Sequence, residues 1–98
     1  MIHIGIFNRV GAFVENKDVA RDIRIKEIIP ALNQGKEVTL DFDKVDAATQ
    51  SFIHVLISDI LRKYGANVLE HIAFKSCNIT VKKIIEIVVD YMLEGMDT

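Results

Sequence analysis

The segment 41–54 brings together several side chains that could do chemistry. It holds three carboxylates, two hydroxyls and an imidazole, which belong to Asp41, Asp43, Asp46, Thr49, Ser51 and His54. Neighbouring carboxylates can attack phosphate or hold a magnesium ion. A serine one helical turn from a histidine can serve as a nucleophile. Exposed hydroxyls can instead accept a phosphoryl group.

The two aspartates Asp41 and Asp43 imitate a phosphatase motif. The stretch 41–45, Asp-Phe-Asp-Lys-Val, resembles the DxDxV motif of haloacid-dehalogenase-type phosphatases, in which an aspartate at a strand end attacks phosphate. Such enzymes need further carboxylates for magnesium, and only Asp46 is near. Because a catalytic site requires all its roles to be filled, we predict instead that these aspartates accept hydrogen bonds from loop N–H groups. A magnesium-dependent phosphatase or phosphotransferase stays as the enzymatic alternative.

Other combinations of nucleophile, base and metal ligand are weaker still. Ser51 and His54 lack a third group that would orient the imidazole, and no glycine turn flanks the serine. His3, His71 and Cys77 have spacings that match no zinc pattern. We therefore predict no catalytic residue, no metal site and no cofactor.

Thr49 and Ser51 stand where a helix begins. Thr49 is a candidate N-cap, and Ser51 is a small polar residue on the predicted solvent face. Their functional interpretation is phosphorylation, at Ser51 first and Thr49 second. A phosphate would add about two negative charges, which a helix N-terminus tolerates but which would repel a partner surface of like charge.

Hydrophobic periodicity predicts the elements that position these residues. Val38 and Leu40 alternate with polar neighbours, as in a strand over 37–42. A helical apolar stripe then runs over 50–64 and ends at Gly65, and its opposite face, with Ser58, is predicted to be exposed. The polar loop between them would lie at the carboxyl end of a strand, where α/β sheets form sites at switch points.

The remaining elements complete an alternating pattern. Strands over 2–7 and 10–14 are predicted to form a hairpin, and a strand is expected over 68–75. A helix runs from the Asn16 cap to Gly35, with a kink or a stop at Pro30, and the last helix follows Asn78. The expected fold is α/β (α+β): a mixed or mostly parallel sheet of about four strands flanked by helices, in the order β-β-α-β-α-β-α. It forms one domain over 1–98.

Composition excludes several classes of protein. The 98 residues include 12 basic and 14 acidic side chains without a long basic run, so a nucleic-acid interface is not expected. The single cysteine fits a reducing compartment. No apolar run approaches the ~20 residues of a membrane span, and no signal peptide begins the sequence. We expect a cytoplasmic protein.

From Gly11 onward the sequence resembles the STAS-like domain family of unknown function, found in bacteria and their phages. The stretches that carry the resemblance are Gly11-Ala-Phe, Ala20-Arg-Asp-Ile-Arg, Val38-Thr-Leu-Asp-Phe, Val45, Thr49-Gln-Ser-Phe with the following leucine and isoleucine stripe, Ile72-Ala-Phe-Lys and Asn78. The resemblance implies a sheet flanked by helices and a docking role without catalysis.

Related anti-sigma-factor antagonists are phosphorylated before their second helix by a kinase with a GHKL-type ATPase fold. In the resemblance, Gln50 stands at the phosphorylated serine and Ser51 at the serine after it. The resemblance therefore implies a regulatory domain that docks such an ATPase through residues 43–54. The contact residues would be Asp43, Asp46, Thr49, Ser51 and His54. A structural alternative is a homo-oligomer, for example a homodimer, whose chains associate through Ile87, Tyr91 and Met96 of the last helix.

Overall fold

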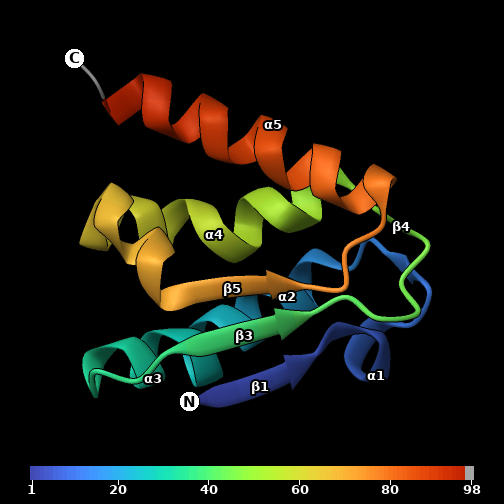
Figure 1. Ribbon diagram of the computed structural model, residues 1–98, viewed down its shortest axis with the longest axis horizontal. Coiled ribbons are helices and arrows are strands. Elements are labelled where there is room, and N and C mark those ends of the chain that lie inside the picture. Colours follow the sequence, from blue (N-terminus) through green and yellow to red (C-terminus); the bar gives the residue numbers. More distant parts are fainter. Residues whose placement is uncertain (97–98) are drawn as a thin grey trace.

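A three-stranded parallel sheet with helices on one face forms the frame of this computed structural model, which describes residues 1–96, without the side chain of Met96. Its strands follow one another in the order β1-β3-β5. Helix α4 packs against both the first long helical segment and α5. Because successive right-handed crossovers continue in one direction, these helices share one face of the sheet (Figure 1).

The elements are β1 (Ile2–Gly5), α1 (Ile6–Val10), β2 (Phe13–Val14), α2 (Lys17–Ile23), a π-helical turn (Arg24–Ile28), α3 (Ile29–Asn33), β3 (Val38–Asp41), β4 (Ala47–Ala48), α4 (Gln50–Tyr64), the 3₁₀ helix η2 (Ala66–His71), β5 (Ile72–Lys75) and α5 (Ile79–Met96). Without the short α1, β4 and η2, this is the predicted order, and the α/β class is confirmed.

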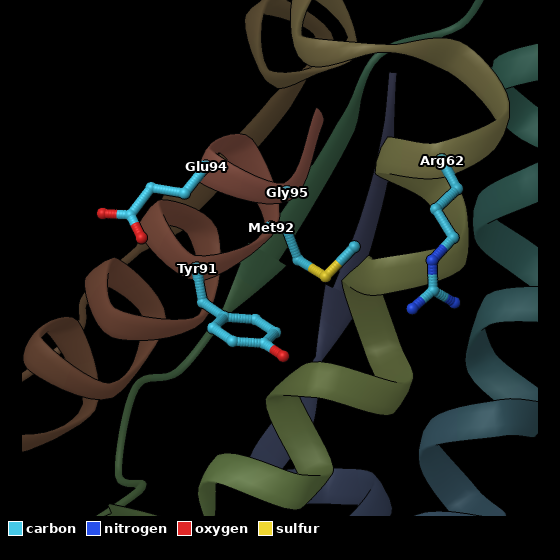
Figure 2. A pocket seen from close by; sticks show the side chains of 5 residues that line it. All are labelled: Arg62, Tyr91, Met92, Glu94 and Gly95. Carbon is cyan, nitrogen blue, oxygen red and sulfur yellow. The ribbon is translucent and has the colours of Figure 1, made fainter. Parts of the chain in front are cut away.

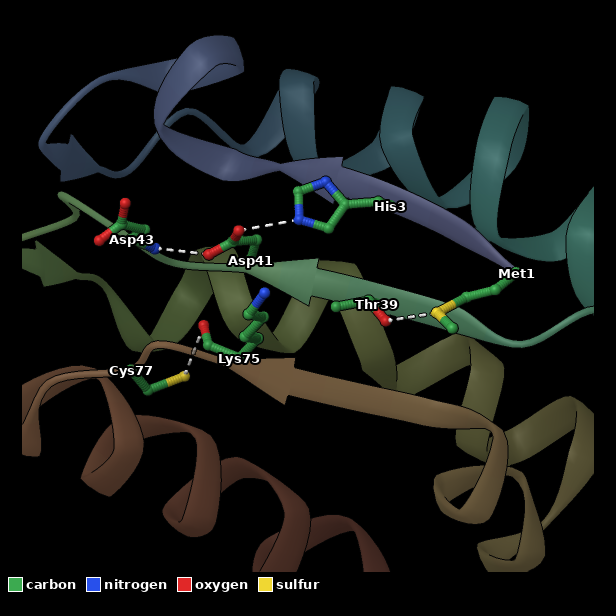
Figure 3. A network of polar contacts seen from close by, with 7 residues as sticks. All are labelled: Met1, His3, Thr39, Asp41, Asp43, Lys75 and Cys77. Atoms are coloured by element: carbon green, nitrogen blue, oxygen red, sulfur yellow. Dashed lines mark hydrogen bonds and ion pairs between the residues drawn. The ribbon is translucent and has the colours of Figure 1, made fainter.

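The two faces of the sheet differ in polarity. Ile4 and Leu40 are buried beneath the helices, and Phe74, the neighbour of Leu40 in register, is partly buried there. The other face carries His3, Thr39 and Asp41 (Figure 3), and no described helix covers it. Parallel sheets usually bury both faces. Here His3 is exposed to water and Asp41 is half-buried, whereas Thr39, whose hydroxyl contacts Sδ of Met1, is only 9% exposed.

The predicted hairpin is wrong, and of the two kinds of sheet expected, mixed or mostly parallel, the structure has the parallel one in every described strand pair. Residues 6–10 form a helical turn that ends at Gly11, whose φ of 102° is left-handed. β2 pairs in parallel with β4, in a second sheet of two strands, instead of folding back on β1. Periodicity could not show this because the partner strand lies far along the chain. The predicted strand over 68–75 is confirmed only from Ile72, since η2 occupies its first half.

The helix that contains Pro30 neither stops nor restarts. The chain stays helical from Lys17 to Asn33, and a π-helical turn precedes the proline. A wider turn of this kind accommodates the missing N–H and the proline ring. As predicted, Asn16 caps the start of this helix, and Gly35, with a φ of 75°, follows its end.

Helix α4 supplies much of the core. Its predicted apolar stripe is buried throughout: Phe52, Ile53, Leu56, Ile57, Ile60 and Leu61. The predicted exposure of Ser58 is wrong, since that residue is only 3% exposed. The reason is that α4 has packed neighbours on two sides, α2 and α5, so its buried surface is wider than one stripe. None of the helices in the described part of the chain has the length and apolar run needed to span a bilayer.

Candidate functional site

On one side, the loop that joins β3 to α4 is fixed by backbone hydrogen bonds to the segment around β2. The Asp46 N–H donates to the carbonyl oxygen of Ala12 at 2.8 Å. Three residues later, the Thr49 N–H donates to the carbonyl oxygen of Val14 at 2.9 Å. These bonds flank the β2–β4 pairing, so residues near the N-terminus fix the end of the loop.

The start of α5 holds the same loop from the other side. The side-chain amide of Asn78 donates to the carbonyl oxygens of Val45 at 3.1 Å and Asp46 at 2.9 Å. Its carbonyl oxygen accepts from the N–H of Val81 at 2.8 Å, which confirms the predicted cap. One side chain therefore caps a helix and also fixes the loop.

The polar side chains of the loop point into solvent although its backbone is fixed. Asp43, Lys44 and Asp46 are exposed, whereas Val45 is buried and anchors the loop in the core. Lys44 has a left-handed φ of 70°, and its ammonium lies 5.8 Å from the centre of the Phe7 ring. The loop thus presents two carboxylates on a fixed frame.

The beginning of α4 adds a second group of predicted residues. Thr49 caps the helix by accepting from the Phe52 N–H at 3.1 Å, as predicted. Ser51 is exposed and His54 is half-buried. The two line an open hollow of about 400 Å³ with Gln50, Val55 and Lys17, the first residue of α2. The hollow therefore brings Ser51 and His54 beside a lysine from another helix.

The predicted contact residues thus fall into two adjoining groups. Asp43 and Asp46 belong to the loop and do not line the hollow that contains Ser51 and His54. Sequence reasoning did not select Lys17 as a site residue, and found Asn78 only as a cap. The only sequence feature that draws attention to Lys17 is the N-cap residue before it. The nearness of Lys17 to Ser51 depends on how α2 packs against α4.

Asp41 lies beside the loop in a polar network on the uncovered face of the sheet (Figure 3). One carboxylate oxygen accepts from the Asp43 N–H at 2.9 Å, and the other lies 2.8 Å from Nε2 of His3. The Asp43 N–H, and then His3, hold the pKa of Asp41 below its usual value. Asp41 therefore closes the turn, as the structural interpretation predicted.

The other side chains considered for catalysis or metal binding do not come together in the described part of the chain. Among residues 1–96, no cluster of three His, Cys, Asp or Glu side chains could hold a metal ion. His71 and Cys77 lie beyond opposite ends of β5, and His71 instead approaches Glu37 at 3.9 Å. Within the described residues, no hydrogen bond links the side chains of Ser51 and His54.

The expectation of a switch-point crevice was wrong. Such a crevice needs a strand order that reverses, whereas β1, β3 and β5 follow one another in a single direction. The loop after β3 is instead covered from both sides by the chain itself, through Ala12 and Asn78. What stays accessible is an outer surface of side chains.

A family model described as "STAS-like domain of unknown function (DUF4325)" matches residues 20–82, well over half of the chain. This chain belongs to the STAS-like domain family. The match is shorter than the resemblance, which began at Gly11, but it contains every predicted contact residue from Asp43 to His54. No curated protein and no solved structure matches the chain significantly.

Proposed function

We propose that this STAS-like domain is a non-catalytic regulatory module of the cytoplasm that docks a protein partner through loop 43–49 and the first turn of α4. The observation that carries the proposal is a rigid backbone with exposed polar side chains. Asp43 and Asp46 project from a loop fixed by Asn78 and by the β2 segment. A surface ordered in advance binds with a smaller entropic cost than a mobile one.

The chemistry of the surface indicates what the partner offers. Two carboxylates on the loop fit arginine or lysine side chains, which bind carboxylates with charge-assisted hydrogen bonds. The likeness to anti-sigma-factor antagonists supports one class of partner, a kinase with a GHKL-type ATPase fold. The hollow beside the loop, with Ser51 and His54, would complete the contact.

Phosphorylation at Ser51 would regulate this docking. Ser51 is exposed in the first turn of α4, whereas the Thr49 hydroxyl already accepts from a backbone N–H and is half-buried. A phosphate on Ser51 would gain from the helix N-terminus and from Lys17 across the hollow. The domain would stay folded while its docking surface became more negative.

A charge reversal tests the docking surface. The loop variant carries Asp43→Arg and Asp46→Arg, and its matched control carries Asp22→Arg and Glu70→Arg, which alter two other exposed carboxylates. The probe is a purified GHKL-type kinase from the same cell, titrated by calorimetry. We expect the control to bind like the wild type and the loop variant to bind at least about tenfold more weakly. Equal binding by the loop variant would reject the loop as the contact.

Incubation with the same kinase, ATP and Mg²⁺ tests the regulation. Mass spectrometry should locate the phosphate on Ser51, and Ser51→Ala should remain unmodified. Modification elsewhere would contradict the assignment of this residue. Magnesium-dependent hydrolysis of p-nitrophenyl phosphate by the domain alone, lost in Asp41→Asn, would instead support the phosphatase alternative and overturn the non-catalytic proposal.

A further inference from the structure

The outer side of α5 carries apolar side chains that no other described element covers. Ile87 is 41% exposed and Tyr91 is 66% exposed, although both stand in a helix whose inner side is buried. Figure 2 shows the Tyr91 ring beside an open hollow of about 480 Å³ next to α4, whereas the neighbouring Met92 is a buried core residue. Exposed apolar residues aligned along a helix indicate an interaction surface.

The charges along this helix are arranged in opposite signs on either side of Ile87. Lys83 stands one turn before it, and Asp90 one turn after it, both exposed. Residues seven apart share nearly the same side of a helix, so these two charges lie on one flank of Ile87. Ile84 and Tyr91, also seven apart, lie on the other flank.

We propose that α5 binds α5 of a second copy of this chain, antiparallel, about a twofold axis at Ile87. In an antiparallel twofold pair, each flank of one helix faces the same flank of the other copy with the chain direction reversed, so a residue before the centre lies near one about as far after it. Lys83, four residues before Ile87, then lies beside Asp90 of the other copy, three residues after it, and on the other flank Ile84 lies beside Tyr91, twice each. In each pair the offset along the helix is one residue, about 1.5 Å. A parallel twofold pair would instead place the flank with Lys83 and Asp90 against the flank with Ile84 and Tyr91 of the other copy. The self-complementary charge pattern therefore selects a second copy, in this orientation.

The pairing would leave both docking loops free. Asn78 links the start of α5 to the loop in each chain, so an antiparallel pair places the two loops at opposite ends of the α5 seam. The seam spans at most the 18 residues of α5, roughly 27 Å. A single helix pair makes a small interface, typical of weak association. We expect dimers at concentrations on the order of 100 µM.

Sedimentation equilibrium from about 10 to about 500 µM tests the pairing, with circular dichroism as a check on folding. Ile87→Asp and Lys83→Glu should each weaken dimerisation at least about tenfold. The doubly swapped variant, Lys83→Glu with Asp90→Lys, restores opposite charges and should return to within about threefold of the wild type. Lys82→Glu makes the same charge change away from the seam and should also stay within about threefold.

Two results would overturn the proposal. One is a wild-type chain that remains monomeric up to about 500 µM. The other is a dimer whose affinity the charge swap fails to recover, because recovery requires Lys83 and Asp90 to face each other across the twofold axis. Neither result bears on docking through loop 43–49, which is measured with a different partner and different variants.

Discussion

Replacing Asn78 with alanine should cost more than the loss of an ordinary helix cap. The cap itself, an acceptor for the Val81 N–H, contributes about 1 kcal/mol. The two donations to the carbonyl oxygens of Val45 and Asp46 contribute about 0.5–1.5 kcal/mol each. The free energy of unfolding should therefore fall by about 2–4 kcal/mol, which corresponds to a decrease in Tm of roughly 10–20 °C.

Two further variants separate the cap from the link to the loop. Asn78→Asp keeps an acceptor for the cap but removes the amide donor, so its free energy of unfolding should be about 1–3 kcal/mol lower than that of the wild type. Asn16→Ala removes a cap that contacts only the N–H groups of its own helix, those of Asp18 and Val19, and should lose about 1 kcal/mol. Asn78 thus caps a helix and also bonds to the loop, whereas Asn16 only caps a helix, so the difference between the two positions measures the bonds to the loop.

Urea unfolding followed by circular dichroism measures these differences. An unchanged slope against urea concentration would show that the variants alter stability and not the mechanism of unfolding. If Asn78→Ala costs no more than Asn16→Ala, or if Asn78→Asp is as stable as the wild type, the link between α5 and the loop does not stabilise the fold. The account of a rigid docking surface would then lose its main support.

Three other outcomes follow from single contacts. Arg24 donates to the Val55 carbonyl oxygen at 2.7 Å, so Arg24→Met should lower the free energy of unfolding by about 1–3 kcal/mol. The exposed Arg21→Met should leave it almost unchanged in the same urea assay. Because the pKa of Asp41 is lowered in the folded state, its stabilising contribution is present above its unfolded pKa and is lost as the pH falls through its folded pKa. Asp41→Asn should therefore flatten the acid side of stability measured against pH. Gly65→Ala forces a side chain into a φ of 82° with a ψ of 175°, a conformation that essentially only glycine adopts. It should lower the free energy of unfolding by about 1–3 kcal/mol in thermal melts, although nothing lies close to the new methyl group.

Local patterns were enough to predict much of the frame. The helix over 50–64 has the bounds that the sequence predicted, from its Thr49 cap to Gly65. Asn16 and Asn78 cap helices as predicted. Helix bounds and caps depend on the hydrogen bonds of a single turn and on the order of apolar residues, so a short stretch of sequence is enough to predict them.

The candidate site was predictable in its residue types but not in its arrangement. The exposed loop carboxylates and the Ser51 hydroxyl lie where the sequence placed them, beside a strand end and a helix start. Their division into a loop and a hollow, and the nearness of Lys17 to Ser51, depend on how α2 packs against α4. The sequence pattern of neither helix predicts that Lys17 and Ser51 lie near each other.

The sequence by itself determined the α/β class, the long central helix, its caps and the polar character of the segment after β3. Only the tertiary structure decided that β2 pairs with β4, that Ser58 is buried and that Asn78 fixes the loop. The physical reason is the range of the interactions. Caps and periodicity act within a turn or two, whereas strand partners and helix neighbours are chosen by contacts between segments far apart in the chain.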